Sequence, residues 1–114
     1  MEITIGNWEV LKFSCNLPAG TNLSEADEIT VQLKTPAGTI ALSKTIGHGV
    51  TINTPLEDDI QLEILSSDYG NFAGAGKYPI AVEIDWEDDK EQEIGLTEDG
   101  KKLTYVSVKA EQIV

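Results

Sequence analysis

The run Gly76–Trp86 constrains the fold of this chain more than any other segment. Within it, large apolar side chains alternate with Pro, Ala, Glu and Asp, and this period of two is typical of a strand with one buried face. Pro79 lies inside the run and has no backbone N–H, so it belongs at a strand start, a bulge or an edge. The run predicts an all-β protein and indicates no chemistry. The side chains expected in the core are Tyr78, Ile80, Val82, Ile84 and Trp86.

Similar alternation recurs along the whole chain, in short segments separated by turns rich in Pro, Gly, Asn and Asp. About eight strands at this spacing, without a long helical pattern, predict a sandwich or a barrel. We expect a single domain spanning residues 1–114. Ser66–Gly70 is expected to form one short helical turn, capped by serine and ended by glycine. The expected strands are Trp8–Cys15, Glu28–Thr35, Ile40–Thr45, Val50–Ile52, Ile60–Ile64, Tyr78–Trp86, Glu91–Leu96 and Lys102–Ala110.

The charge balance argues against several classes of partner. Eight Lys and Arg residues oppose twenty Asp and Glu residues, which gives a formal net charge of −12. Nucleic acids and anionic membrane surfaces both select cationic proteins, so we expect neither as a partner. No apolar run approaches the roughly 20 residues of a membrane-spanning helix. The first residues also lack the basic start and apolar stretch of a signal peptide.

The residue types give little support for catalysis. His48, the only histidine, lies between two glycines in an expected loop, whereas nucleophilic catalysis needs a histidine beside a serine or cysteine and an orienting carboxylate. Cys15, the only cysteine, follows a strand pattern, which favours a small buried hydrophobe over a reactive thiol. Gly74 and Gly76 precede a strand and not a helix, so they form no phosphate-binding loop. We therefore expect no enzyme, and no catalytic, cofactor-binding or metal-binding residue.

Acidic residues concentrate between positions 83 and 99. This stretch holds nine Asp and Glu residues and one lysine, so it carries −8 of the net charge of −12. Calcium prefers such oxygen ligands, but several must converge on one point, and the spacing from Asp85 to Asp89 does not match an EF-hand loop. A solvated acidic hairpin that guards sheet edges explains the same residues. Calcium binding by the hairpin stays open.

The order of turn and strand motifs resembles that of a known family. The motifs are, in order, Gly6–Trp8, Asn22–Ser24, Pro36–Thr39, Ser67–Asp68 and Gly76–Tyr78. In this order the chain resembles small immunoglobulin-like structural proteins of tailed bacteriophages and prophages, such as the N-terminal domain of the baseplate upper protein. The resemblance covers residues 6–96. It departs from the family at Asn22–Ser24, where an acidic residue is usual, and Lys101–Val114 lies outside the pattern.

The resemblance implies an immunoglobulin-like antiparallel β-sandwich of about seven or eight strands. It also implies a non-catalytic structural or assembly role in the tail or baseplate, in the virion and, during assembly, in the host cytoplasm. The partners would be other virion proteins or a second copy, with Leu103–Val108 expected to mediate self-association. A carbohydrate- or cell-surface-binding module with an aromatic platform at Trp8 or Tyr69 is the alternative. An enzyme using His48 or paired carboxylates is a third class.

Overall fold

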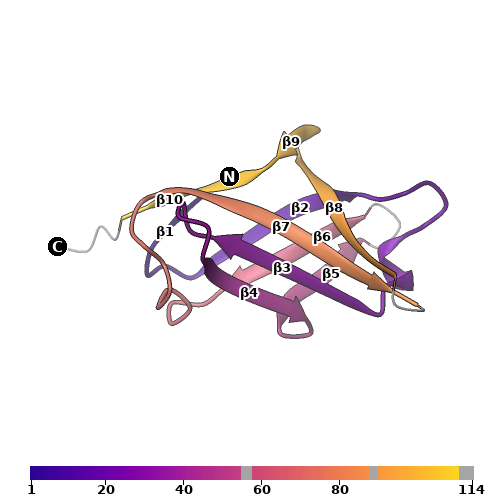
Figure 1. Ribbon diagram of the computed structural model, residues 1–114, viewed down its shortest axis with the longest axis horizontal. Coiled ribbons are helices and arrows are strands. Elements are labelled where there is room, and N and C mark those ends of the chain that lie inside the picture. The colour runs from indigo at the N-terminus through magenta and orange to yellow at the C-terminus, as the bar shows by residue number, and fades with distance from the viewer. Residues whose placement is uncertain (55–57, 88–89, 111–114) are drawn as a thin grey trace.

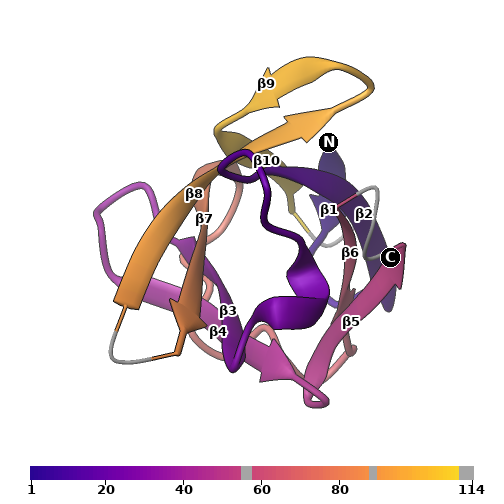
Figure 2. The same cartoon turned by 90° about the vertical axis from the view of Figure 1, so that its right-hand side faces the viewer.

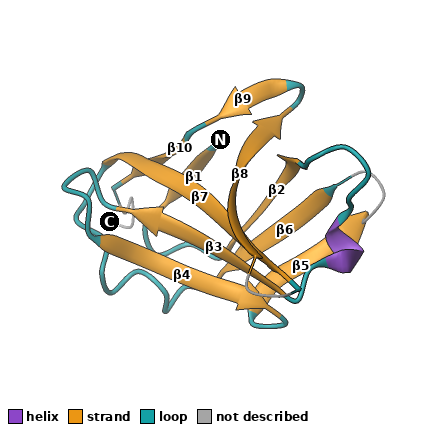
Figure 3. Cartoon of the chain, turned by 45° about the vertical axis from the view of Figure 1, so that its right-hand side comes forward, coloured by secondary structure: helices purple, strands orange, loops and turns teal. Residues whose placement is uncertain are grey.

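The computed structural model describes residues 1–54, 58–87 and 90–110, and strands dominate it (Figure 1). The one helical segment among them is a short 3-10 turn, η1 (Leu23–Glu25) (Figure 3). No helix in this part of the chain has the length and apolar character needed to cross a membrane. The prediction of a nearly all-β protein is confirmed. The strands are β1 (Glu2–Thr4), β2 (Glu9–Asn16), β3 (Glu28–Lys34), β4 (Ile40–Ile46), β5 (Gly49–Thr54), β6 (Asp59–Ile64), β7 (Gly76–Trp86), β8 (Lys90–Glu98), β9 (Lys101–Leu103) and β10 (Tyr105–Lys109).

Seven of the strands close into a barrel. Around the ring the order is β7, β3, β4, β5, β6, β2 and β8, and β8 returns to pair with β7 (Figure 2). The closing ladder is antiparallel and runs from the pair Val82 and Ile94 to the pair Trp86 and Lys90. The predicted immunoglobulin-like antiparallel β-sandwich is therefore wrong, because the strands form one closed barrel and not two open sheets.

The pattern that favoured a sandwich is equally compatible with a barrel wall. Both architectures bury one face of each strand, so a period of two cannot distinguish them. Closure depends instead on pairing between distant segments, since β2 pairs with β6 along one edge and with β8 along the other. It also depends on a tight turn that places β4 and β5 in a short parallel pair. Gly49 follows this turn with a φ of 106°, a left-handed conformation that favours glycine.

Three short strands extend the structure beyond the ring, where β7 and β8 diverge (Figure 2). The N-terminal part of β7 pairs with β10, which pairs in parallel with β1. The C-terminal part of β8 forms a hairpin with β9. The predicted last strand, Lys102–Ala110, is thus two strands that break at Thr104. The Thr104 carbonyl accepts a hydrogen bond from the Ile80 N–H at 3.1 Å, which holds the break against β7.

Pro79 occupies a position in β7 where no N–H is needed. The ladder between β7 and β3 begins at Ile80, one residue later. The Ile80 N–H points to the β10 side, where it donates to Thr104, and successive residues of a strand point to opposite edges. The Pro79 nitrogen therefore faces the β3 side, before that ladder begins. This meets the requirement that proline lie at the start or edge of a ladder.

Tyr78 anchors the loop before β7 to the core. It is fully buried, and its ring stacks on Phe72 with the centroids 5.0 Å apart. Its hydroxyl accepts a hydrogen bond from the Ala73 N–H at 2.8 Å and donates one to the Gly74 carbonyl at 2.7 Å. The predicted inward face of β7 is correct for Tyr78 and for the aliphatic residues that alternate after it.

Two local predictions differ from the structure. Trp86, expected in the core, is only partly buried at the end of β7. Ser66–Gly70 forms turns and not a helical turn, because its backbone hydrogen bonds are separate turns, from Asp68 N–H to the Leu65 carbonyl and from Phe72 N–H to the Tyr69 carbonyl. The Asp68 side chain pairs with Lys44 at 2.7 Å. The helical turn lies instead at η1, where the Asn22 side chain accepts from the N–H of the second helical residue.

Candidate functional site

The two side chains considered for catalysis lie in different environments. His48 is exposed in the turn between β4 and β5, whereas Cys15 is buried inside the barrel on β2. Burial, together with the smaller effect of the Asp58 and Asp59 charges, raises the pKa of the Cys15 thiol to about 12. The thiol is therefore protonated and shielded at neutral pH. The interpretation of Cys15 as a buried hydrophobe is confirmed, and the absence of enzymatic activity stays a prediction.

Three carboxylates of the acidic segment meet on the outer face of β7 and β8. Glu83, Asp85 and Glu91 each offer an oxygen atom, and these atoms lie within 4.8 Å of one another. Asp85 and Glu91 are direct cross-strand partners, and one Asp85 oxygen is buried without a hydrogen-bond partner. Oxygens at this spacing could share a hard cation, although like charges opposite each other also occur on solvated faces at a cost in stability. The neighbouring Asp88 and Asp89 lie outside the described residues, and calcium binding stays open.

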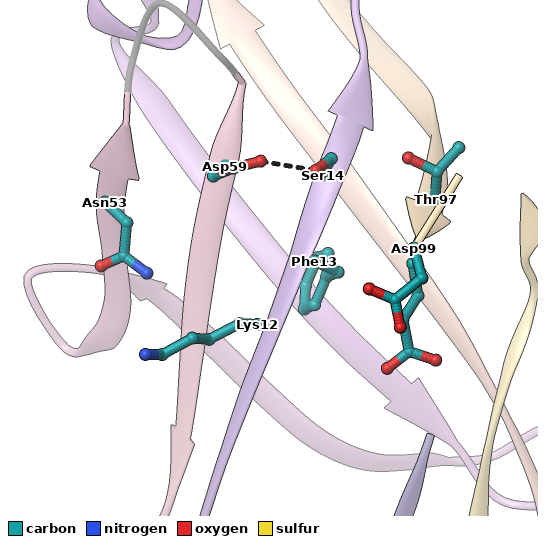
Figure 4. A pocket seen from close by; sticks show the side chains of 8 residues that line it. Lys12, Phe13, Ser14, Asn53, Asp59, Thr97 and Asp99 are labelled. Atoms are coloured by element: carbon teal, nitrogen blue, oxygen red, sulfur yellow. Dashed lines mark hydrogen bonds between the residues drawn. The ribbon is translucent and has the colours of Figure 1, made fainter. Parts of the chain in front are cut away.

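A polar cleft lies between the barrel wall and the tip of the β8–β9 hairpin (Figure 4). Its volume is about 510 Å³, which falls within the range of small-molecule sites, roughly 300–1,000 Å³. Four strands and the hairpin turn contribute to it. The lining residues are Lys12, Phe13, Ser14, Asn53, Asp59, Thr97, Glu98 and Asp99.

Ser14 lies at the centre of this cleft. In register it pairs with Asp59 on β6 and with Thr97 on β8, and its hydroxyl donates a hydrogen bond to Asp59 Oδ1 at 2.5 Å. Lys12 lies two residues earlier on the same outward face of β2. Figure 4 shows its ammonium group pointing to the side of Asn53, away from the hairpin. The cleft therefore presents hydroxyl, amide, ammonium and carboxylate groups together.

Trp8 continues the outward face of β2 beyond the cleft. Its side chain is 61% exposed, and its Nε1 donates a hydrogen bond to Glu63 Oε2 at 2.9 Å. Leu65, at the end of β6, is also exposed. Tyr69 is held differently, because it is partly buried against the core and its hydroxyl donates to the Asn7 carbonyl at 2.7 Å. Of the two aromatics predicted for a carbohydrate platform, Trp8 is therefore the accessible one.

Comparison with known proteins identifies no family for this chain. No protein-family model matches it, and no curated protein is significantly similar to it. The resemblance to phage structural proteins thus rests on motif order alone, and the sandwich that it implied conflicts with the closed barrel.

Proposed function

We propose that this chain is a non-catalytic structural or assembly protein of a tailed-phage or prophage particle, associated with its tail or baseplate. The order of turn and strand motifs across residues 6–96 supports this role. The proposed partners are other virion proteins or a second copy. The proposed location is the virion and, during assembly, the host cytoplasm.

The two ends of the strand order carry the proposal. Among the described strands, β1 and β9 lie at the two ends of the strand order, and each is three residues long. The seven strands of the ring have no such end, because in the closed ring each pairs with two neighbours. An exposed strand edge can dock an added strand from a partner through backbone hydrogen bonds. Short edges limit uncontrolled association. This arrangement suits a protein that makes a small number of defined contacts in an assembly.

Both edge strands border one groove of about 470 Å³. Glu2 at the start of β1 and the preceding Met1 line one side. Lys101–Tyr105, from β9 through the break to the start of β10, lines the other. Tyr105 is 42% exposed, and the Lys77 ammonium lies 4.8 Å from the centroid of its ring. Exposed aromatic residues are enriched among those that dominate binding energy at protein interfaces. The groove therefore combines two strand edges with an aromatic contact point.

The expected location of self-association changes with the structure. Leu103–Val108 was predicted to mediate it, yet β10 is paired on both edges, by β1 and by β7. Val106 and Val108 face the core and are no more than 2% exposed. Self-association stays a prediction, and within Leu103–Val108 the residues left available for it are Leu103 and Tyr105, which border the groove.

Incorporation into particles tests the proposal. Particles induced from the strain that encodes the chain would be purified on a density gradient and their proteins quantified by mass spectrometry. We expect the chain at a fixed ratio to tail proteins, in particles or in tail assembly intermediates. Tyr105→Ala should lower this ratio, whereas Trp8→Ala, an exposed aromatic outside the groove, should not. Absence of the wild-type chain from every particle and intermediate fraction would refute the proposal.

A further inference from the structure

A strip of outward-facing side chains runs along β2, from the cleft shown in Figure 4 to Trp8. Alternation places Val10, Lys12 and Ser14 on the outward side of β2. Trp8, directly before the strand, lies on the same side, since its indole bonds to Glu63, the partner of Val10 on β6. Ser14, at the centre of the cleft, lies six positions after Trp8, which corresponds to about 20 Å along a strand. The strip meets the groove of β1 and β9 only at the hairpin tip, where Glu98 and Asp99 line both. Its dimensions suit an elongated ligand.

The cleft end of the strip offers both donors and acceptors of hydrogen bonds. Asn53 supplies an amide, Ser14 and Thr97 supply hydroxyls, and Asp59 supplies a carboxylate. The hydrogen bond from Ser14 to Asp59 holds two of these groups in place before a ligand arrives. A hydroxyl group both donates and accepts, so a ligand rich in hydroxyls finds matching partners here.

The other end of the strip offers an apolar surface. Trp8 is 61% exposed, yet the hydrogen bond from its indole N–H to Glu63 restricts its orientation. Leu65 adds exposed aliphatic surface at the end of the adjacent strand β6. The negative face of an aromatic ring attracts weakly positive C–H groups, and one face of a sugar ring presents several of them. An exposed, oriented indole beside polar groups is suited to stack on such a ring.

Charge selects among hydroxyl-rich ligands. Asp59, Glu98 and Asp99 line the cleft, against Lys12 as its one cation, and the whole chain carries −12. A ligand that bears carboxylates or sulfates is therefore repelled, whereas a neutral or amino-bearing ligand is not. Lys12 takes part in none of the ion pairs found in the described residues, so its ammonium remains available as a donor.

We infer that this strip binds a short neutral or amino-bearing oligosaccharide. One sugar ring stacks on Trp8, and a second occupies the cleft beside Asn53 and Asp59. This binding site goes beyond the structural role proposed above and does not depend on it.

An oligosaccharide array tests the inference. The purified chain is applied to immobilised short oligosaccharides in neutral, amino-bearing and carboxylate-bearing sets, and the strongest binder is then titrated by calorimetry. We expect binding to the neutral or amino-bearing set and none to the carboxylate set. Trp8→Ala and Asn53→Ala should each weaken binding about tenfold, while Tyr105→Ala should leave it unchanged. Circular dichroism confirms that the variants, all at exposed side chains, keep the fold.

Four results would overturn the inference. The first is no binding to any oligosaccharide set, and the second is binding that Trp8→Ala and Asn53→Ala leave unchanged. The third is binding to polar peptides printed on the same array with none to sugars, which would assign the strip to a protein partner. The fourth is a preference for the carboxylate set. Each result is independent of whether the chain enters particles, so failure here and failure of the structural role are distinguishable.

Discussion

Replacing Tyr78 with phenylalanine removes one oxygen atom and the two hydrogen bonds that join β7 to the loop before it. The ring is fully buried, and its hydroxyl bonds to the Ala73 N–H at 2.8 Å and to the Gly74 carbonyl at 2.7 Å. Phenylalanine keeps the ring and its stacking on Phe72. The substitution Tyr78→Phe therefore isolates the contribution of the hydroxyl.

The expected loss in the free energy of unfolding follows from the two bonds. A hydrogen bond of this kind contributes a net ~1 kcal/mol, so the pair contributes about 2 kcal/mol. For a chain of this size the melting temperature should fall by about 8 °C. Ala73 and Gly74 lie on an exposed loop, so water can replace part of what is lost. This places the lower bound of the effect at about 1 kcal/mol.

Urea unfolding followed by far-ultraviolet circular dichroism measures this loss by linear extrapolation. Tyr105→Phe is the matched control, because Tyr105 is 42% exposed and its ring, which contacts Lys77, is retained. The control should change the free energy of unfolding by less than about 0.5 kcal/mol. If Tyr78→Phe is no more destabilising than the control, the loop is not anchored by this hydroxyl and the reasoning is refuted.

Three further predictions concern the core, the thiol and the acidic face. Val106→Lys places a charge at a fully buried position of β10 and should prevent folding, whereas Tyr105→Lys on the opposite face should fold; a folded Val106→Lys variant in circular dichroism would contradict the assigned face. The Cys15 thiol, whose pKa is raised to about 12 by burial and by nearby Asp charges, should react with a disulfide reagent at about pH 8 only after denaturant is added. Rapid reaction of the native protein would show that the thiol is accessible. Glu91→Lys replaces a repulsive pair with Asp85 by an attractive one and should raise the free energy of unfolding by about 0.5 kcal/mol in urea titrations. This gain should shrink in about 1 M salt, and a loss of stability at low salt would show that repulsion between these two carboxylates does not destabilise the native protein.

Local pattern was sufficient to locate most of the strands. Glu28–Thr35 was predicted and β3 spans Glu28–Lys34, because three aliphatic residues alternate cleanly there. β1 was missed, since a strand of three residues is too short to show a period. The helical turn predicted at Ser66–Gly70 was wrong, since serine and glycine favour isolated turns as well as helix caps, and the segment forms separate hydrogen-bonded turns.

The candidate sites, like the strands, were only partly predictable from the sequence. The sequence indicated an acidic hairpin, and the antiparallel ladder of β7 and β8 does place Asp85 opposite Glu91. No pattern in the sequence indicates the polar cleft. Ser14, Asn53 and Thr97 are far apart along the chain and become neighbours only because β2 pairs with both β6 and β8. Trp8 was recognised as a candidate, but its exposure depended on which face of β2 the barrel buried.

By itself the sequence determined which side chains face inward in strands with clean alternation, such as β3 and β7, because alternation along a strand is a local property of the backbone. It determined in this way the core positions of Tyr78 and of the aliphatic residues that follow it in β7. Only the tertiary structure decided that the strands close into a barrel. Closure is set by which edges pair, and the backbone groups that form these ladders are the same in every residue except proline. The one residue that does report on an edge, Pro79, marks where the β3 ladder has not yet begun.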